Sequence, residues 1–110
     1  MSQGASRLES LEKMLPSMPK DRRLRYFLAV EYRKAGRPAD AAEQLRSYIE
    51  MAPAEDVGAA WRDLGLCLED LGKTAEAHEA YREGIRSAQA HRHGDLAGEI
   101  QALDELLSGR

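Results

Sequence analysis

The sequence predicts an all-α protein built as an array of antiparallel helix pairs, for three reasons. Ala, Leu, Glu and Arg dominate the 110 residues, which are 43% apolar but only 5% aromatic, a composition typical of helices. Apolar residues recur at spacings of three and four, the period that places side chains on one helix face. A helix, turn and helix unit occurs twice, because Gly36 and Gly72, like Ala41 and Ala77, are 36 residues apart (72 minus 36, 77 minus 41).

The first 21 residues are expected to form a tail and one short helix. Residues 1–5 are mostly small and polar, so we expect them to be disordered. Ser6 fits a helix N-cap, with Glu9 as its capping-box partner. Pro16 ends the helix, because proline cannot donate the backbone hydrogen bond that a continuing helix needs. The apolar stripe of this helix consists of Leu8, Leu11, Met14 and Leu15.

Residues 22–57 are predicted to form the first complete helix pair. Asp21 is a suitable N-cap for its first helix, and Gly36 marks the turn. Pro38 begins the second helix, where its fixed backbone angle is favourable, and Pro53 ends it. The apolar faces consist of Leu24, Phe27, Leu28, Tyr32 and Ala35, then of Ala41, Ala42, Leu45, Tyr48, Ile49 and Met51.

Residues 58–91 are predicted to form the second pair, and residues 92–110 a final amphipathic helix. Gly72 provides the turn within the pair, Gly94 breaks the chain, and Asp95 is the expected N-cap of the last helix. The apolar faces consist of Trp61, Leu64, Leu68 and Leu71, of Ala77, Ala80, Tyr81, Gly84, Ile85 and Ala88, and of Leu96, Ile100, Leu103 and Leu107.

The second pair resembles the tetratricopeptide repeat in its signature residues. That signature reads Trp, two residues, Leu-Gly, two residues, Tyr, then Ala, three residues, an aromatic residue and a closing Pro. The matching positions hold Trp61, Leu64, Gly65, Leu68, Ala77 and Tyr81, with Leu68 in the Tyr place. Gln89 stands where the closing Pro is expected, which predicts that the second helix continues past the usual stop.

The first pair departs further from the same signature. Arg25 takes the Trp place, Ala29 the Gly place, and Tyr48 a position that is normally small. The usual period is about 34 residues, so we interpret two residues near Asp56 and Val57 as an insertion between the copies. We therefore expect the first pair to pack less regularly than the second.

The resemblance implies a single domain, an α-α superhelix in which helix pairs stack as a right-handed solenoid. The helix of residues 1–21 is then half a repeat, because it fits the register of the later copies shifted by about 34 residues. Residues 22–57 and 58–91 are the two complete repeats, and residues 92–110 are a capping helix.

The resemblance also implies a non-enzymatic adaptor or scaffold that binds a peptide or partner segment in the concave groove formed by the first helices. On this chain the groove positions are Arg23, Tyr26, Val30, Arg33, Lys34, Ala59, Arg62, Leu66, Glu69 and Asp70. All but Ala59 and Asp70 are our candidates for partner-binding residues. Tyr26 and Arg62 are of the types enriched at protein interfaces, while the plain alternative is a solvated helix face.

The charge distribution favours an acidic partner over nucleic acid. Between Lys20 and Arg37 there are seven basic residues against two acidic ones, an excess that attracts an acidic segment or a carboxylate terminus. Residues 56–110 carry 6 basic and 11 acidic groups, which would repel phosphate. Self-association as a homodimer is a further alternative, because about three repeats are normally needed for a stable stack.

We expect no catalytic activity, cofactor site or metal site in this chain, because the sequence lacks the residue patterns that such sites need. GxSxG, HExxH and glycine-rich phosphate loops do not occur. His78, His91, His93 and Asp95 lack the spacing of a metal site, and the single Cys67 is expected to be a small buried residue. The start of the chain has no signal-like run and no stretch reaches the roughly 20 apolar residues of a membrane span, so we expect a cytoplasmic protein.

Overall fold

The computed structural model describes residues 3–109, with side chains described from residue 7 onward. This part of the chain contains six α-helices, one short 3-10 helix and no strand, which confirms the predicted all-α class. The elements are α1 (Gln3–Met14), the 3-10 helix η1 (Leu15–Ser17), α2 (Arg22–Lys34), α3 (Pro38–Met51), α4 (Gly58–Asp70), α5 (Thr74–Ala90) and α6 (Gly94–Ser108). No helix of the described residues is long and apolar enough to cross a membrane.

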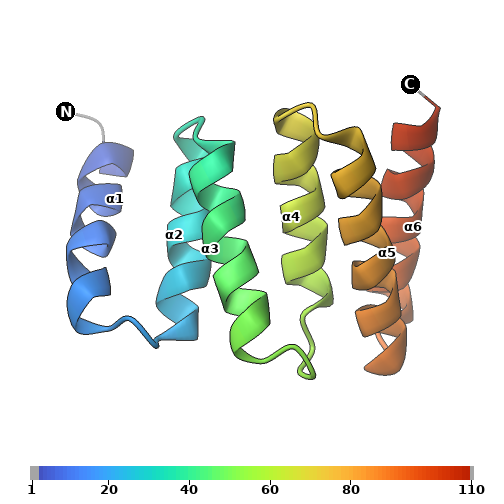
Figure 1. Ribbon diagram of the computed structural model, residues 1–110, viewed down its shortest axis with the longest axis horizontal. Coiled ribbons are helices and arrows are strands. Elements are labelled where there is room, and N and C mark those ends of the chain that lie inside the picture. Colours follow the sequence, from blue (N-terminus) through green and yellow to red (C-terminus); the bar gives the residue numbers. More distant parts are fainter. Residues whose placement is uncertain (1–2, 110) are drawn as a thin grey trace.

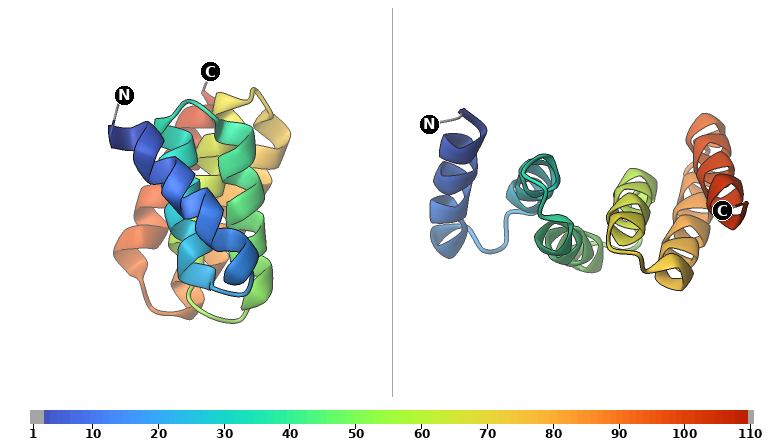
Figure 2. Two further views of the ribbon diagram at one scale, coloured as in Figure 1. Left: turned by 90° about the vertical axis from the view of Figure 1, so that its left-hand side faces the viewer. Right: turned by 90° about the horizontal axis from the view of Figure 1, so that it is seen from above.

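The helices stand side by side in chain order, with α1 at one end and α6 at the other (Figure 1). Each helix packs mainly on the helices that precede and follow it, which is the organisation of a repeat array. Seen from above, α2, α4 and α6 lie in one layer and α3 and α5 in the other (Figure 2, right). The first helices of successive pairs therefore share one face of the molecule.

The three first helices begin 36 residues apart. They start at Arg22, Gly58 and Gly94 (58 minus 22, 94 minus 58), and the second helices at Pro38 and Thr74 keep the same interval (74 minus 38). The last helix, α6, thus has the register of another first helix. Without a proline in the closing place, α5 runs for 17 residues against 14 in α3, which confirms that it passes the usual stop.

Glycines set the two turns inside the helix pairs. Gly36 and Gly72 both have a φ of +74°, in the left-handed region that favours glycine. No atom lies within 4 Å of a Cβ built at either position, so the requirement is one of conformation and not of space. At the start of α2, the Asp21 side chain accepts a hydrogen bond from the Leu24 amide at 3.2 Å, which confirms the predicted N-cap.

The turn before α6 was predicted wrongly. Its left-handed residue is Arg92, with a φ of 60°, and the His93 amide closes the turn on the Ala88 carbonyl at 2.7 Å. Gly94 is already the first residue of α6, and Asp95 lies in the first helical turn instead of capping it. A non-glycine residue, Arg92, therefore adopts the left-handed conformation that ends α5, which the sequence pattern did not reveal.

The start of α1 also differs from the prediction. The helix begins at Gln3, so Ser6 lies inside it and is not an N-cap. The expected disorder of residues 1–5 is wrong for residues 3–5, and residues 1–2 lie outside the described part. Nothing in this segment stops a helix, since Gln3 and Ala5 are good helix formers.

The two helix pairs solve the same packing problem with different residues. In the second pair the Tyr81 ring is fully buried against Gly65, where an added Cβ would lie 2.6 Å from Tyr81 Cδ1. In the first pair Ala29 and Leu45 occupy these two positions and both are buried. A larger residue on one helix is thus matched by a smaller one on its neighbour, which preserves the close approach.

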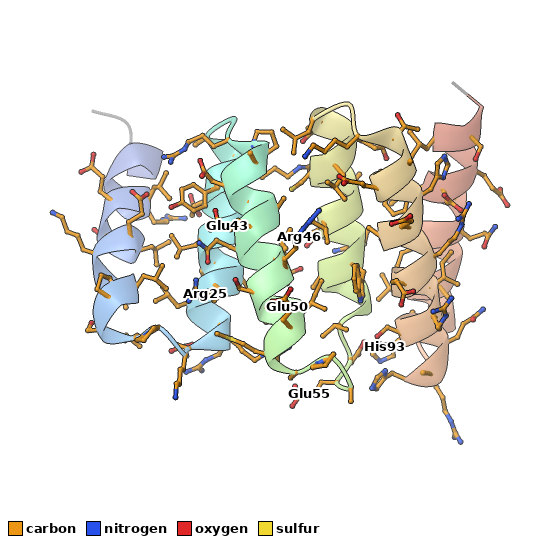
Figure 3. The ribbon with its side chains drawn as sticks, in the orientation of Figure 1. Arg25, Glu43, Arg46, Glu50, Glu55 and His93 are labelled. Carbon is orange, nitrogen blue, oxygen red and sulfur yellow. The ribbon has the colours of Figure 1, made fainter. Side chains whose placement is uncertain are left out.

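Arg25, in the Trp place of the first pair, uses hydrogen bonds where a tryptophan would use apolar contact. Its guanidinium donates to Gln44 Oε1 at 3.0 Å and to the Pro19 carbonyl at 3.0 Å. These contacts join α2 to α3 and to the segment before α2. The position is seen near the base of α2 in Figure 3.

Candidate functional site

A pocket of about 410 Å³ opens between α2 and α4, on the side of the molecule formed by the first helices. Its floor is apolar and its rim is charged. The lining residues are Tyr26, Ala29, Val30, Arg33 and Lys34 of α2, Leu45 of α3, and Asp63, Cys67 and Asp70 of α4. Of the eight predicted site residues, the pocket brings together Tyr26, Val30, Arg33 and Lys34.

The other predicted site residues lie outside the pocket lining. They are Arg23, Arg62, Leu66 and Glu69. The lining residues that the prediction missed on α4 include Asp63 and Cys67, which with the groove position Asp70 follow one another at spacings of four and three. That spacing marks one helix face and was available as a signal.

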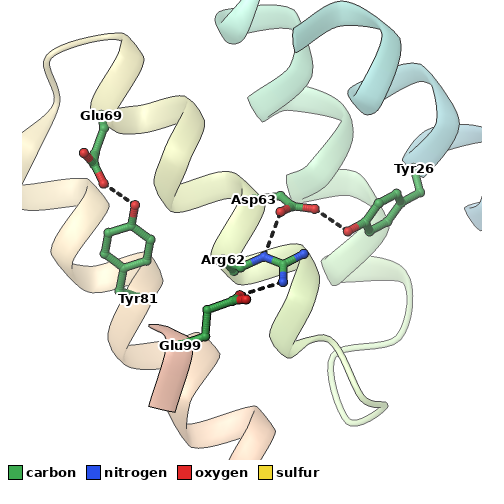
Figure 4. Close-up of polar contacts among 6 residues, drawn as sticks. All are labelled: Tyr26, Arg62, Asp63, Glu69, Tyr81 and Glu99. Atoms are coloured by element: carbon green, nitrogen blue, oxygen red, sulfur yellow. Dashed lines mark hydrogen bonds and ion pairs between the residues drawn. The ribbon is translucent and has the colours of Figure 1, made fainter. Parts of the chain in front are cut away.

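A chain of polar contacts crosses the three first helices (Figure 4). The Tyr26 hydroxyl of α2 donates to Asp63 of α4. Arg62 donates from Nε to Asp63 Oδ1 at 3.0 Å and from Nη1 to Glu99 Oε2 of α6 at 2.8 Å. Tyr26 and Arg62, chosen from the sequence as partner anchors, are therefore already engaged in holding α2, α4 and α6 together.

Protonation follows from these contacts. Burial, followed by the hydrogen bond to Asp63, raises the pKa of Tyr26 well above its ordinary value, so its hydroxyl stays a donor. Partial burial acts to lower the pKa of Arg62, but the hydrogen bonds and charges of Glu99 and Asp63 outweigh it and the pKa is raised. Both groups thus keep the protonation state that the chain of contacts requires.

The Tyr26 ring packs against Tyr48, which in turn packs against the Arg22 guanidinium. Its centroid lies 5.0 Å from that of Tyr48 in an edge-to-face arrangement at 79°. The Arg22 guanidinium lies over the Tyr48 ring, 4.0 Å from its centroid, and contacts Glu55 at 2.9 Å. The unusual Tyr48 therefore supports one wall of the pocket.

One stripe of α2 faces solvent beside the pocket and contains an aromatic residue. Arg23, Phe27, Val30 and Lys34 follow at spacings of four, three and four, and all are exposed. The prediction that Phe27 belongs to the buried apolar face is wrong, because 59% of this residue is exposed. The buried face of α2 is offset from Phe27 and includes Leu24 and Leu28, so the three-and-four spacing that included Phe27 spanned two faces.

The cations beside the pocket differ in how far they are neutralised. Arg33 forms an ion pair with Asp70 across the pocket mouth at 3.2 Å. Lys34 lies 3.7 Å from Glu31, within its own helix. Arg23 is 85% exposed and its nearest carboxylate, Asp21, is 3.9 Å away. Positive charge is therefore available mainly at Arg23 and Lys34.

The other residues considered for a binding or metal site, Glu69, Cys67 and His78, are buried or contact other helices of the chain. Glu69 accepts a hydrogen bond from Tyr81 and so joins α4 to α5 (Figure 4). Burial raises the pKa of the Cys67 thiol, which is 1% exposed, to about 11. Within the described residues, no group of three His, Cys, Asp or Glu side chains is placed to hold a metal ion. His78 instead pairs with Asp104.

A second, wider groove of about 590 Å³ lies on the opposite face, between α3 and α5. Trp61, Leu64 and Leu68 of α4 and Ala80 of α5 are its apolar residues, and both walls carry charges of both signs. Arg46 and Glu50 form part of the α3 wall, and with Glu43 they follow the front of that helix in Figure 3. No predicted site residue lines this groove.

Comparison with known proteins agrees with this architecture. The tetratricopeptide repeat family profile matches residues 2–55 and 26–91. TPR repeat-containing protein PA0015 of Pseudomonas aeruginosa is 36% identical over 99 residues, which cover 90% of this chain and 87% of that protein. The solution structure of protein BPP2914 from Bordetella parapertussis superposes with a TM-score of 0.77 at 28% identity, covering 92% of this chain and 86% of that one.

The chain is a helical-repeat protein, and it belongs to the tetratricopeptide repeat family. This confirms the family suggested by its signature residues. Tetratricopeptide repeats generally mediate protein–protein interactions and are generally non-catalytic.

Proposed function

We propose that this chain is an adaptor that binds a segment of another protein in the concave pocket between α2 and α4. The observation that supports the proposal is the stripe of Arg23, Phe27, Val30 and Lys34 beside the pocket. A merely solvated face would be polar throughout, whereas this one exposes an aromatic and a branched apolar side chain between two cations.

The pocket determines which chemistry fits. Its volume lies within the roughly 300–1,000 Å³ of pockets that hold small ligands, so it has room for one or two apolar side chains. Ala29, Leu45 and Cys67 supply an apolar floor. Carboxylates that flank the inserted side chain would meet Lys34 at the rim and Arg23 farther along the exposed stripe of α2. An acidic segment with an apolar anchor is the partner that this arrangement favours.

The test replaces exposed residues in the pocket lining and beside it, whose loss should leave the fold intact. Partners are captured from cells of the source organism, the contacting segment is mapped by cross-linking, and its affinity is measured by calorimetry as a synthetic peptide. Phe27→Ala with Val30→Ala should weaken that affinity by about 30-fold or more, as expected for a central anchor. Met51→Ala removes a comparable exposed side chain on α3, outside the pocket lining, and should leave it unchanged. Equal affinity for all three proteins would remove the proposal.

Self-association is the second candidate, and two helices favour it. Leu106 on α6, at one end of the array, is 64% exposed, and Phe27 on α2, the second helix from the other end, is 59% exposed. Two copies could each cover the apolar residue of the other, as in the symmetric dimers that are commonest among oligomers. Sedimentation velocity at micromolar concentration tests this, since a single species of monomer mass would exclude it.

We also propose a cytoplasmic location. The single cysteine, Cys67, is buried against neighbouring helices and has no second cysteine with which to form an internal disulfide. Such a thiol suits a reducing compartment. Fractionation of source cells with detection of the native chain would test the location, and recovery outside the cytoplasmic fraction would contradict it.

A further inference from the structure

The layer of first helices changes charge from one end to the other when all residues of each helix are counted. Counted over Lys, Arg, Asp and Glu, α2 has five cations and one carboxylate, a net charge of +4 (5 minus 1). Helix α4 has one cation and three carboxylates, a net charge of −2 (1 minus 3), and α6 has four carboxylates and no cation, a net charge of −4. The layer of first helices is therefore basic at the α2 end and acidic at the α6 end.

The 36-residue register places equivalent residues next to one another on this face. The row formed by Val30, Leu66 and Ala102 is apolar on all three helices (66 minus 30, 102 minus 66). Val30 and Ala102 are exposed and Leu66 is partly exposed. An apolar row thus crosses this face from the basic helix α2 to the acidic helix α6.

Charges at the two ends remain open to a ligand. At the α2 end, Arg23 and Lys34 project from the exposed stripe, and their ion pairs are long ones with nearby residues of the chain, to Asp21 at 3.9 Å and to Glu31 at 3.7 Å. At the α6 end, Asp95 and Glu105 are exposed, and neither forms an ion pair with another side chain in the part of the chain that the structure describes, although Glu105 accepts a hydrogen bond from Gln101 of its own helix at 3.1 Å. Glu99 is already committed to Arg62.

We propose that the bound segment lies across the three first helices in one fixed direction, with acidic residues over α2, apolar residues over the middle row and basic residues over α6. This inference rests on the proposed function and adds the composition and polarity of the partner. The molecule measures 38 Å along its longest axis, with α1 and α6 at the two ends, so the crossing from α2 to α6 takes on the order of 20 Å, or roughly six extended residues. The reverse direction would place like charges together at both ends.

A segment fits this face better than a second copy of the chain. Two concave faces meet only at their rims, which leaves the pocket between α2 and α4 empty. A narrow segment can follow the apolar row and still insert a side chain into that pocket.

Three synthetic probes of equal length test the polarity with the full chain. All share an apolar centre; the first has an acidic and a basic flank, the second two acidic flanks and the third two basic flanks. We expect the first to bind the wild type most tightly by fluorescence anisotropy at low salt. Arg23→Glu with Lys34→Glu should weaken it by about tenfold and make the third probe the preferred ligand. Asp95→Lys with Glu105→Lys should instead make the second probe preferred.

A nitroxide on the acidic flank of the first probe reports its direction. Amide signals of α2 should broaden, and those of α6 should not. Broadening of α6, or no change of preference in the α6 variant, would overturn the polarity while leaving groove binding intact.

Two results together would overturn both proposals: the wild type binds none of the three probes, and the variant with Phe27→Ala and Val30→Ala binds the natural partner as tightly as the wild type does. Sedimentation would identify a second copy as the occupant if the wild type had the mass of two chains and either charge-reversal variant had the mass of one. That result would also overturn the inference.

Discussion

Arg62 extends from α4 to α6, where its guanidinium contacts Glu99 at 2.8 Å while its Nε contacts Asp63 of its own helix at 3.0 Å. Because Asp63 also accepts from Tyr26 of α2, one arginine completes a connection across three helices. Replacing Arg62 or Tyr26 would therefore disturb the array as well as any partner. The exposed residues Phe27 and Val30 are the cleaner positions at which to test binding.

The first prediction concerns that connection. Arg62→Ala should lower the free energy of unfolding by about 1 kcal/mol, since it removes two charge-assisted contacts whose partner Glu99 is half exposed and screened by solvent. Urea denaturation followed by circular dichroism measures the change. Arg82→Ala is the matched control on the exposed side of α5, and its stability should be unaffected. Equal stability of Arg62→Ala and the wild type would show that the contacts contribute nothing.

The second prediction concerns the close approach of α4 and α5. Gly65→Ala should destabilise the protein by about 1–3 kcal/mol, because the added Cβ would overlap the Tyr81 ring. Tyr81→Leu with Gly65→Ala recreates the combination found at Ala29 and Leu45, so the double variant should lose less than the two single losses together. A double-mutant cycle of urea midpoints measures this coupling, and strict additivity would contradict it.

The third prediction concerns the turn before α6. Arg92→Gly should raise stability by about 1 kcal/mol, because Arg92 holds a left-handed conformation that glycine adopts without a steric penalty. For a chain of this size the thermal midpoint should rise by roughly 4–8 °C. Gly72→Ala is the reciprocal variant and should lower the midpoint by a similar amount. An unchanged or lower midpoint for Arg92→Gly would mean that its side-chain contacts outweigh the strain.

The fourth prediction concerns alkaline pH. Burial raises the pKa of Cys67 from 9.0 to about 11, and burial with the Glu12 hydrogen bond raises the pKa of Tyr32 from 10.0 to about 12. The unfolded chain therefore loses these protons first, so the stability they contribute is complete below pH 9 and falls as pH rises from 9 to 12. For the buried thiol of Cys67 the fall should amount to about 3 kcal/mol, because its pKa is raised by two tenfold steps and each corresponds to about 1.4 kcal/mol.

Urea midpoints measured from pH 8 to 12 test this dependence. Cys67→Ala should flatten the part of the curve between pH 9 and 11, and Tyr32→Phe the part between pH 10 and 12. A slope that neither substitution alters would assign the alkaline loss to other groups.

The sequence was sufficient for the helices and their order, because each depends on local signals. Asp21, Gly36 and Pro38 act within a few residues of their own positions, and the apolar period reports a helix face directly.

The polar contacts of the site could not be predicted in the same way. Tyr26 and Asp63 are 37 residues apart on different helices, and so are Arg62 and Glu99. Helical period says which face a residue occupies but not which side chain lies opposite it on the next helix. Phe27 shows a second limit, since three-and-four spacing joins positions on both edges of a buried face. The composition of a stripe cannot decide which edge is covered.

The connection through Arg62 has a mechanical consequence. One apolar core runs through all the helix pairs, whereas the contacts that join α2 to α4 and α4 to α6 directly include hydrogen bonds and ion pairs near the surface. Ionic strength weakens the exposed ties and leaves the hairpins largely unaffected. We therefore expect added salt to loosen the layer formed by α2, α4 and α6, and with it the pocket between α2 and α4, while each helix stays folded.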